Sequence, residues 1–312
     1  MPSISLPGGS LLIVGSGNDT ITVFGPGTVS AGDGTDAVDV KGNGIVGLGK
    51  GNDTVTVEGN GAVSVGSGKD IITVYKDGTV WAGSGNDTIT MDGNGIVSAG
   101  SGNDLVTLHG NGGISVGGGN DTLTLYGSGT IDQDGSSGHD TINLGSGNDT
   151  IYEAGKATVY GSFGSASISG GALSITHSSG VNEDIAVSGN VTLMGSATHT
   201  EFVGGSGSSL LQGGSGHDTF VGGAGHDTMS GIGTGNVFEF LSTAQGGQHV
   251  IQNFASGDQL YIEGYSLSAL QAAHDISTSG GNTIIKIDGG KTTIELQGYT
   301  SLKASDITTH KP

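Results

Sequence analysis

The chain has 312 residues, among them 65 glycines, and carries 9 basic against 29 acidic residues for a net charge of −20. All basic residues are lysine, and an acidic chain without arginine repels polyanions, which excludes nucleic-acid binding. Only 33% of the residues are hydrophobic and none is cysteine, which excludes a thick core, disulfides and thiolate metal sites. No apolar run reaches the roughly 18 residues of a membrane span.

From residue 15 to 133 the chain repeats every 17 residues without a slip. Apolar residues alternate within each unit, which predicts two short strands joined by two glycine turns. The inward columns of the first strand are Ile21, Val38, Val55, Ile72, Ile89, Val106 and Leu123, with Val23, Val40, Val57, Val74, Met91, Leu108 and Leu125. Stacked first strands and stacked second strands would form two sheets whose apolar sides face each other. This predicts an all-β fold, a right-handed parallel β-roll or β-solenoid with thin coils.

The two turns of each unit differ in charge. One is Gly-Asn-Gly in most units, a structural turn, and the other is Gly-x-Gly followed by a polar residue and Asp. The second turn places Asp19, Asp36, Asp53, Asp70, Asp87, Asp104 and Asp121 in one column. Carboxylates stacked about 4.8 Å apart repel one another unless a divalent cation lies between them. We therefore expect a metal at this edge.

This turn resembles the nonapeptide repeat of RTX proteins, and the best matches are GGSGHDTFV from 213 and GGAGHDTMS from 222. The resemblance implies Ca²⁺ as the cofactor, on the order of ten ions. The implied carboxylate ligands are the seven Asp above with Asp140, Asp149, Asp218 and Asp227, while Ser209 and Asn236 stand where flanking copies lack the Asp. The implied carbonyl ligands are those of Gly15, Gly17, Gly32, Gly34, Gly49, Gly51, Gly66, Gly68, Gly83, Gly85, Gly100, Gly102, Gly117, Gly119, Gly214, Gly216, Gly223 and Gly225.

Composition divides the chain into four predicted regions. Residues 1–153 form a roll with calcium turns at one edge, and 154–194 continue it without the calcium code. Residues 195–240 form a nonapeptide roll with calcium turns at both edges, and 241–312 form a small β-rich cap. Within the cap we expect a short helix opened by Ser266 and a hairpin turned at Asp288-Gly289-Gly290. The last region resembles the C-terminal end of RTX proteins exported by type I secretion, where an uncleaved signal lies.

Three functions fit these features, and none is enzymatic, because no catalytic motif is found. The first is a secreted structural protein that folds on Ca²⁺ outside the bacterial cell and assembles with copies of itself, end to end or laterally. The second is the calcium-folded secretion module of an enzyme or toxin. The third is an ice- or glycan-binding solenoid, with a cell-surface polysaccharide as the partner in the glycan case. The 17-residue unit resembles the ice-binding repeats of an RTX adhesin and has outward threonines, but it departs from them where Ser16, Asp33 and Lys50 replace a threonine of the turn. Phe24, Tyr75, Trp81 and Tyr126 are either sugar platforms or ordinary surface residues. We expect export through type I secretion machinery, since no N-terminal signal peptide is recognisable.

Overall fold

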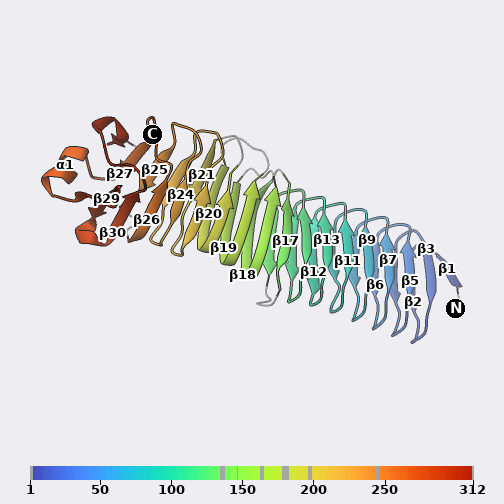
Figure 1. Cartoon of the computed structure of the whole chain (residues 1–312). Coiled ribbons are helices and arrows are strands. Elements are labelled where there is room, and N and C mark those ends of the chain that lie inside the picture. The colour runs from blue at the N-terminus through green and yellow to red at the C-terminus, as the bar shows by residue number, and fades with distance from the viewer. Residues whose placement is uncertain are drawn as a thin grey trace. The chain divides into compact units, whose positions relative to one another are not determined.

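The computed structural model describes residues 3–133, 138–145, 147–161, 165–177, 183–195, 199–242 and 246–310. The chain divides into two compact units, Met1–Thr158 and Val159–Pro312, shown in Figure 1 from blue to green and from green to red. Among the described residues, no helix combines the length and the apolar character that crossing a bilayer requires.

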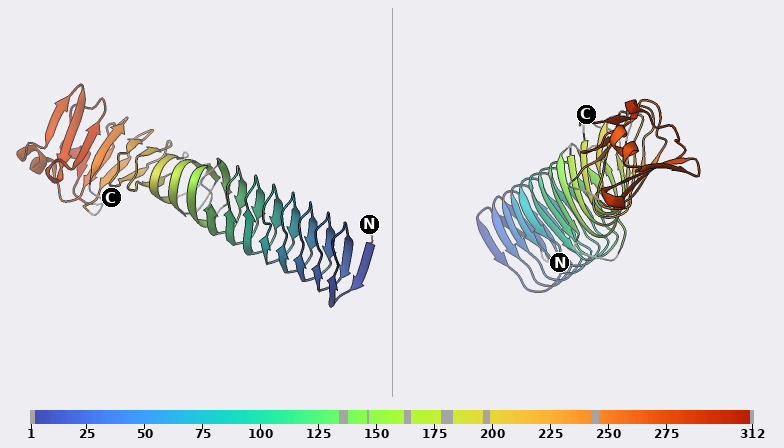
Figure 2. Two further views of the ribbon diagram at one scale, coloured as in Figure 1. Left: turned by 90° about the horizontal axis from the view of Figure 1, so that it is seen from below. Right: turned by 90° about the vertical axis from the view of Figure 1, so that its left-hand side faces the viewer.

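The first unit is a stack of coils, each made of two short strands, and Figure 2 shows the coils following one another along an axis. The strands are β1 (Ser3–Pro7), β2 (Ser10–Ile13), β3 (Thr20–Phe24), β4 (Gly27–Ser30), β5 (Ala37–Val40), β6 (Gly44–Gly47), β7 (Thr54–Val57), β8 (Gly61–Ser64), β9 (Ile71–Val74), β10 (Gly78–Trp81), β11 (Thr88–Met91), β12 (Gly95–Gly100), β13 (Leu105–Leu108), β14 (Gly112–Val116), β15 (Thr122–Leu125), β16 (Gly129–Gln133), β17 (Asp140–Leu144) and β18 (Asn148–Gly161).

Odd-numbered strands stack into a first sheet and even-numbered strands into a second, and all these neighbours are parallel. The register follows the repeat, because Thr56 pairs with Thr73 and Val63 with Val80. The predicted inward columns of the first strand are fully buried between the sheets, as Ile72 and Val74 illustrate. The predicted parallel β-solenoid is confirmed, with side chains of medium size filling its core.

The second unit continues with coils and ends in a small cap. Its elements are β19 (Ser165–His177), β20 (Glu183–Met194), β21 (Thr200–Val203), β22 (Ser209–Gln212), β23 (Thr219–Gly222), β24 (Thr228–Ser230), β25 (Val237–Phe240), β26 (Gly247–Gln252), β27 (Gln259–Ile262), α1 (Leu267–Ala272), β28 (Ile276–Ser279), β29 (Asn282–Ile287), the 3-10 turn Asp288–Gly290, β30 (Thr292–Leu296), the 3-10 turn Ala304–Asp306 and β31 (Ile307–Thr308).

Aromatic side chains replace the aliphatic columns in the core of the second unit. The rings of Phe202, Phe220 and Phe238 stack with centroids 5.0 and 4.9 Å apart, and all three are fully buried. In the cap, Ser266 accepts a hydrogen bond from the Ala269 N–H and so begins α1. The strands β29 and β30 form an antiparallel hairpin through Asp288–Gly290, as the sequence predicts.

Candidate metal centre

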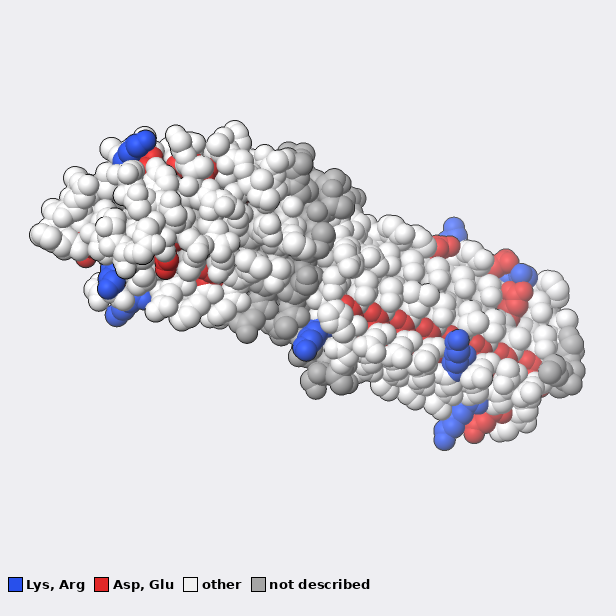
Figure 3. Space-filling model, viewed as in Figure 1, with Lys and Arg blue, Asp and Glu red and all other residues white. Residues whose placement is uncertain are grey.

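The Asp column of the first unit lies along one turn edge of the stack, just before the strands of the first sheet. Figure 3 shows it as a narrow line of acidic residues across the first unit. The column runs through Asp19, Asp36, Asp53, Asp70, Asp87, Asp104, Asp121 and Asp140, and all of these residues are buried. The 17-residue repeat therefore brings the predicted carboxylates into one row, with Asp140 added across the longer connection after β16.

From Asp36 to Asp140, one oxygen of each carboxylate in the row accepts a hydrogen bond from the preceding coil. The backbone N–H of Asp53 donates to Oδ1 of Asp70 at 2.7 Å, and the N–H of Asp70 donates to Oδ1 of Asp87 at 2.9 Å. The same bond recurs along the row to Asp140. This bond fixes each side chain, so the second oxygen of every carboxylate takes the same position in its coil.

The second oxygen, Oδ2, is the unusual atom of the row. Among the residues that the structure describes, it is buried and has no hydrogen-bond partner in Asp36, Asp53, Asp70, Asp87, Asp104 and Asp121 of this row, and likewise in Asp149, Asp218 and Asp227. Burial, with a smaller contribution from neighbouring carboxylates, raises the pKa of Asp70 to about 6 and that of Asp104 to about 7. A buried anion without a donor is strongly unfavourable, so its repetition along the row indicates positions that bind a cation.

Glycine carbonyls supply the remaining oxygens at the same edge. The third residue of each turn, such as Gly34 or Gly51, has a carbonyl that accepts no hydrogen bond among the described residues. The carbonyl of the first residue is engaged instead, since Gly32 accepts from the Gly49 N–H at 3.1 Å. A Cβ on Gly51 would lie 1.5 Å from the Gly34 carbonyl oxygen, and Gly51 has a φ of 158°. Only glycine allows the coils to meet here.

The nonapeptide region carries such rows at both edges. At one edge the N–H of Thr200 donates to Oδ1 of Asp218 at 3.0 Å, and at the other the N–H of Ser209 donates to Oδ1 of Asp227 at 3.0 Å. In the first unit, Asp149 lies at the edge opposite the main row, where the Gly129 N–H donates to its Oδ1. The histidines that precede three of the Asp residues in the rows, His139, His217 and His226, are exposed.

Three side chains that sequence reasoning missed lie at the ends of these rows. The amide of Gln133 donates to Oδ2 of Asp140. Asp258 follows Asn236 in its row, and both of its oxygens accept backbone hydrogen bonds, from the N–H groups of Asn236 and Ala255 at 2.9 Å each. Its turn does not match the motif, because Phe254 and Ser256 stand where the motif has its two glycines.

At the other edge, His249 follows Asp227 where a further Asp would stand. Its Nδ1 lies 3.1 Å from Oδ2 of Asp227, close enough for an ion pair although not aligned as a hydrogen bond, and both side chains are fully buried. Its Nε2 lies 3.0 Å from the Gly246 carbonyl oxygen. The repeat does not predict this position, because His249 lies 22 residues after Asp227, whereas Asp227 lies 18 residues after Ser209.

These donors suit a hard cation. No group of three or more His, Asp or Glu side chains that could hold a metal gathers within the described ranges, so the carbonyls must complete each site. One carboxylate per coil with several carbonyl oxygens is the donor set that Ca²⁺ accepts at six to eight positions. The Oδ2 atoms and third-position carbonyls would hold the ion, which would neutralise the row and join adjacent coils.

The family model of the RTX calcium-binding nonapeptide repeat matches residues 134–152 and 189–231, in four copies. The matched residues include Asp140, Asp149, Asp218 and Asp227 and lie outside the 17-residue array. The chain is an RTX repeat protein, and RTX nonapeptide repeats bind calcium.

A solved structure, that of the extracellular lipase LipA from Serratia marcescens, matches with 15% sequence identity and a TM-score of 0.27. The match covers 65% of this chain and 39% of the lipase, so it spans well under half of the lipase's length. No curated protein matches this chain.

Proposed function

We propose that this RTX repeat protein is a secreted, non-enzymatic structural protein that folds on Ca²⁺ outside the cell and then assembles with copies of itself. The buried Oδ2 atoms support the calcium step, because without a cation the folded coils carry stacked, unpaired carboxylates. The free energy of calcium binding is then free energy of folding. The assembled form would be a surface layer, a matrix fibre or an adhesive scaffold.

The calcium sites also favour a location outside the cell. Extracellular calcium modules bind with dissociation constants of roughly 10⁻⁴ to 10⁻³ M, so cytosolic calcium would leave such sites empty. The chain would cross the type I secretion machinery unfolded and fold on release. RTX repeats are typical of secreted proteins, which agrees with this order of events.

The observation that carries the assembly step is the one-sided pairing of the first coil. Among the described residues, β1 pairs with β3 alone and β2 with β4 alone, which leaves their outer edges without a strand partner. An open edge of a parallel sheet is a template for a further coil.

The test is sedimentation velocity and negative-stain microscopy of the calcium-stripped chain, before and after millimolar Ca²⁺ is added. We expect an expanded monomer to become long or sheet-like particles. A compact monomer in calcium would refute self-assembly while leaving calcium-driven folding intact.

A matched pair of variants locates the contact. Leu12→Lys places an inward charge in the first coil, the device by which natural edge strands block association, and it should suppress growth in calcium. Leu11→Lys adds the same charge on the exposed outer side of the same strand and should assemble like the parent. If both variants assemble equally, the contact does not lie at this end.

A further inference from the structure

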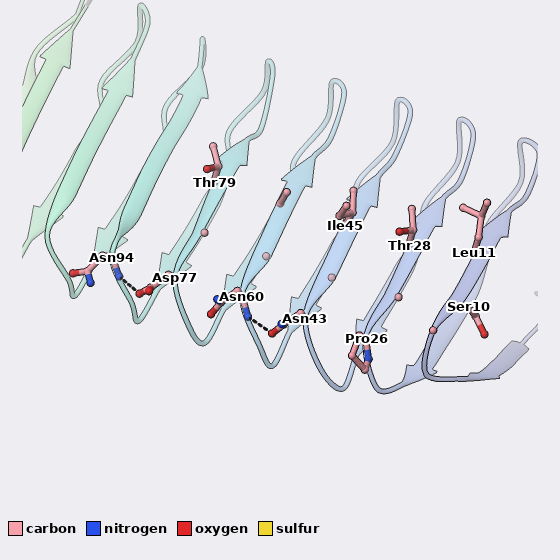
Figure 4. Close-up of a pocket in the computed structure, with 16 residues that line it drawn as sticks. Ser10, Leu11, Pro26, Thr28, Asn43, Ile45, Asn60, Asp77, Thr79 and Asn94 are labelled. Atoms are coloured by element: carbon pink, nitrogen blue, oxygen red, sulfur yellow. Dashed lines mark hydrogen bonds between the residues drawn. The ribbon is translucent and has the colours of Figure 1, made fainter.

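A shallow groove of about 780 Å³ runs along the outer face of the second sheet in the first unit, and we call it the axial groove. Glycines such as Gly44 and Gly61 form its floor. Figure 4 shows two rows of side chains beside this floor, one from the strands and one from the turns. The strand row is Leu11, Thr28, Ile45, Ala62 and Thr79, and the turn row is Pro26, Asn43, Asn60, Asp77 and Asn94.

The backbone of the groove floor is already fully paired. The strands β4, β6, β8 and β10 are hydrogen-bonded to neighbours on both sides. At the turns, the Gly44 N–H donates to the Asn60 carbonyl at 2.9 Å, and the Gly61 N–H donates to the Asp77 carbonyl at 3.0 Å. An extended peptide that needs main-chain partners cannot add here. Any occupant must be recognised by the two rows of side chains.

The turn row offers amide donors at three of its five positions. Oδ1 of Asn43 accepts from the Asn60 N–H at 2.9 Å, and Oδ1 of Asn94 accepts from the Asn111 N–H at 2.8 Å, so these oxygens are used. The amide nitrogens of Asn43 and Asn94, and the whole Asn60 side chain, make no hydrogen bond with any part of the chain that the structure describes. Asn43 and Asn60 lie one coil spacing of about 4.8 Å apart, and Asn94 lies two coils beyond Asn60.

The strand row is apolar or hydroxylated, and the groove is nearly neutral. Leu11 and Ile45 are exposed, and Ile45 shows 59% of its surface. The single charged residue in the lining is Asp77, whose Oδ1 accepts from the Asn94 N–H at 2.8 Å. On a chain of net charge −20, a groove without cations disfavours anionic polymers. Free amides opposite apolar side chains suit the hydroxyl edge and the C–H face of a sugar.

We propose that the axial groove binds an uncharged, linear polysaccharide lying parallel to the coil axis. A β-1,4-linked pyranose chain advances by nearly one coil spacing per sugar, so successive sugars would lie over successive coils, between the strand row and the turn row. Each contact is weak, but their number grows with the length of the chain. This activity goes beyond calcium-dependent assembly and does not depend on it.

Trp81 provides the readout, because it is the only tryptophan of the chain. It lies on β10 two residues after Thr79, on the same outward side of the strand, and is 49% exposed. The calcium-loaded full chain is titrated with cellohexaose while tryptophan fluorescence is recorded. Maltohexaose, whose α-linked chain curves, and polygalacturonate, which is anionic, are the comparison ligands. We expect saturation with cellohexaose, at least tenfold weaker binding of maltohexaose and no response to polygalacturonate.

A matched pair of variants assigns the response to the groove. Ile45→Asp adds a charge to the strand row and should weaken cellohexaose binding at least tenfold. Ile71→Asp makes the same change on the outer face of the first sheet, where Ile71 is 47% exposed, and should stay within twofold of the parent. Asn60→Ala removes a side chain that holds no coil together and should also weaken binding.

Absence of a saturable response to cellohexaose would overturn the proposal, as would equal effects of the two Asp variants or tighter binding of polygalacturonate. Circular dichroism of each variant shows that its coils are formed. Sedimentation of the same samples separates the two functions, because a chain that assembles in calcium without binding cellohexaose refutes only the groove.

Discussion

Replacing one carboxylate of the Asp row should change the stability of the fold in opposite directions with and without calcium. Asp70 is fully buried, its Oδ1 accepts the Asp53 N–H at 2.7 Å and its Oδ2 has no partner. In Asp70→Asn the amide oxygen keeps the first contact while the charge is removed. The chain already uses this arrangement, because Asn236 accepts the Asp218 N–H at 3.0 Å in another row.

The magnitude follows from the pKa. Burial raises the pKa of Asp70 from 3.8 to about 6, which corresponds to roughly 3 kcal/mol of destabilisation at pH 7 when the group is ionised. The new amide nitrogen needs an acceptor, so we expect a smaller net gain of about 1–3 kcal/mol in the absence of calcium. In saturating calcium the sign reverses, because the variant lacks an anionic ligand between two coils.

The assay is osmolyte-induced folding followed by circular dichroism, in chelator and in millimolar Ca²⁺. Asp77→Asn is the matched control, because Asp77 also accepts an N–H from the adjacent coil, Asn94, but is exposed at the opposite turn. We expect the control to change little in either condition. If Asp70→Asn destabilises the calcium-free chain as much as the calcium-loaded one, the buried Asp70 carboxylate is not an uncompensated charge. The inference that a cation must neutralise the row would then be wrong.

Three other predictions test the row carboxylates, the close approach of the coils and the end of a row. Without calcium, the pKa values of the row carboxylates are higher in the folded chain than in the unfolded chain, so the stability of the fold should rise as the pH falls from about 7 to 4. Circular dichroism of the chelated chain that shows less structure at pH 4 than at pH 7 would contradict this. Gly51→Ala should cost several kcal/mol, because its Cβ meets the Gly34 carbonyl, whereas Gly47→Ala has open space, and equal melting temperatures would count against the close approach. His249→Asp should add about one bound Ca²⁺ by equilibrium dialysis, since a carboxylate replaces the imidazole beside Asp227; an unchanged count would show that the row ends there for another reason.

The repeat in the sequence was enough to predict the coils and the position of the main carboxylate row. A 17-residue period with alternating apolar residues admits one stacking register, because a slip of one residue would turn Val55 and Ile72 outward and bury the threonines. The same register forces Asp53 and Asp70 into one column. Local spacing therefore determined the array, and also the two-edged rows of Asp218 and Asp227.

The ends of the rows and the outer groove depended on the tertiary structure. Gln133, His249 and Asp258 reach the rows through connections that break the period, so no spacing placed them beside Asp140, Asp227 and Asn236. Which carboxylate oxygen remains without a donor depends on the hydrogen bond from the neighbouring coil. The groove arises because glycines of stacked coils leave a floor between two rows of side chains. Contacts between neighbouring coils determine these features. Such contacts join residues that are far apart along the chain, and no motif in the sequence around either residue predicts them.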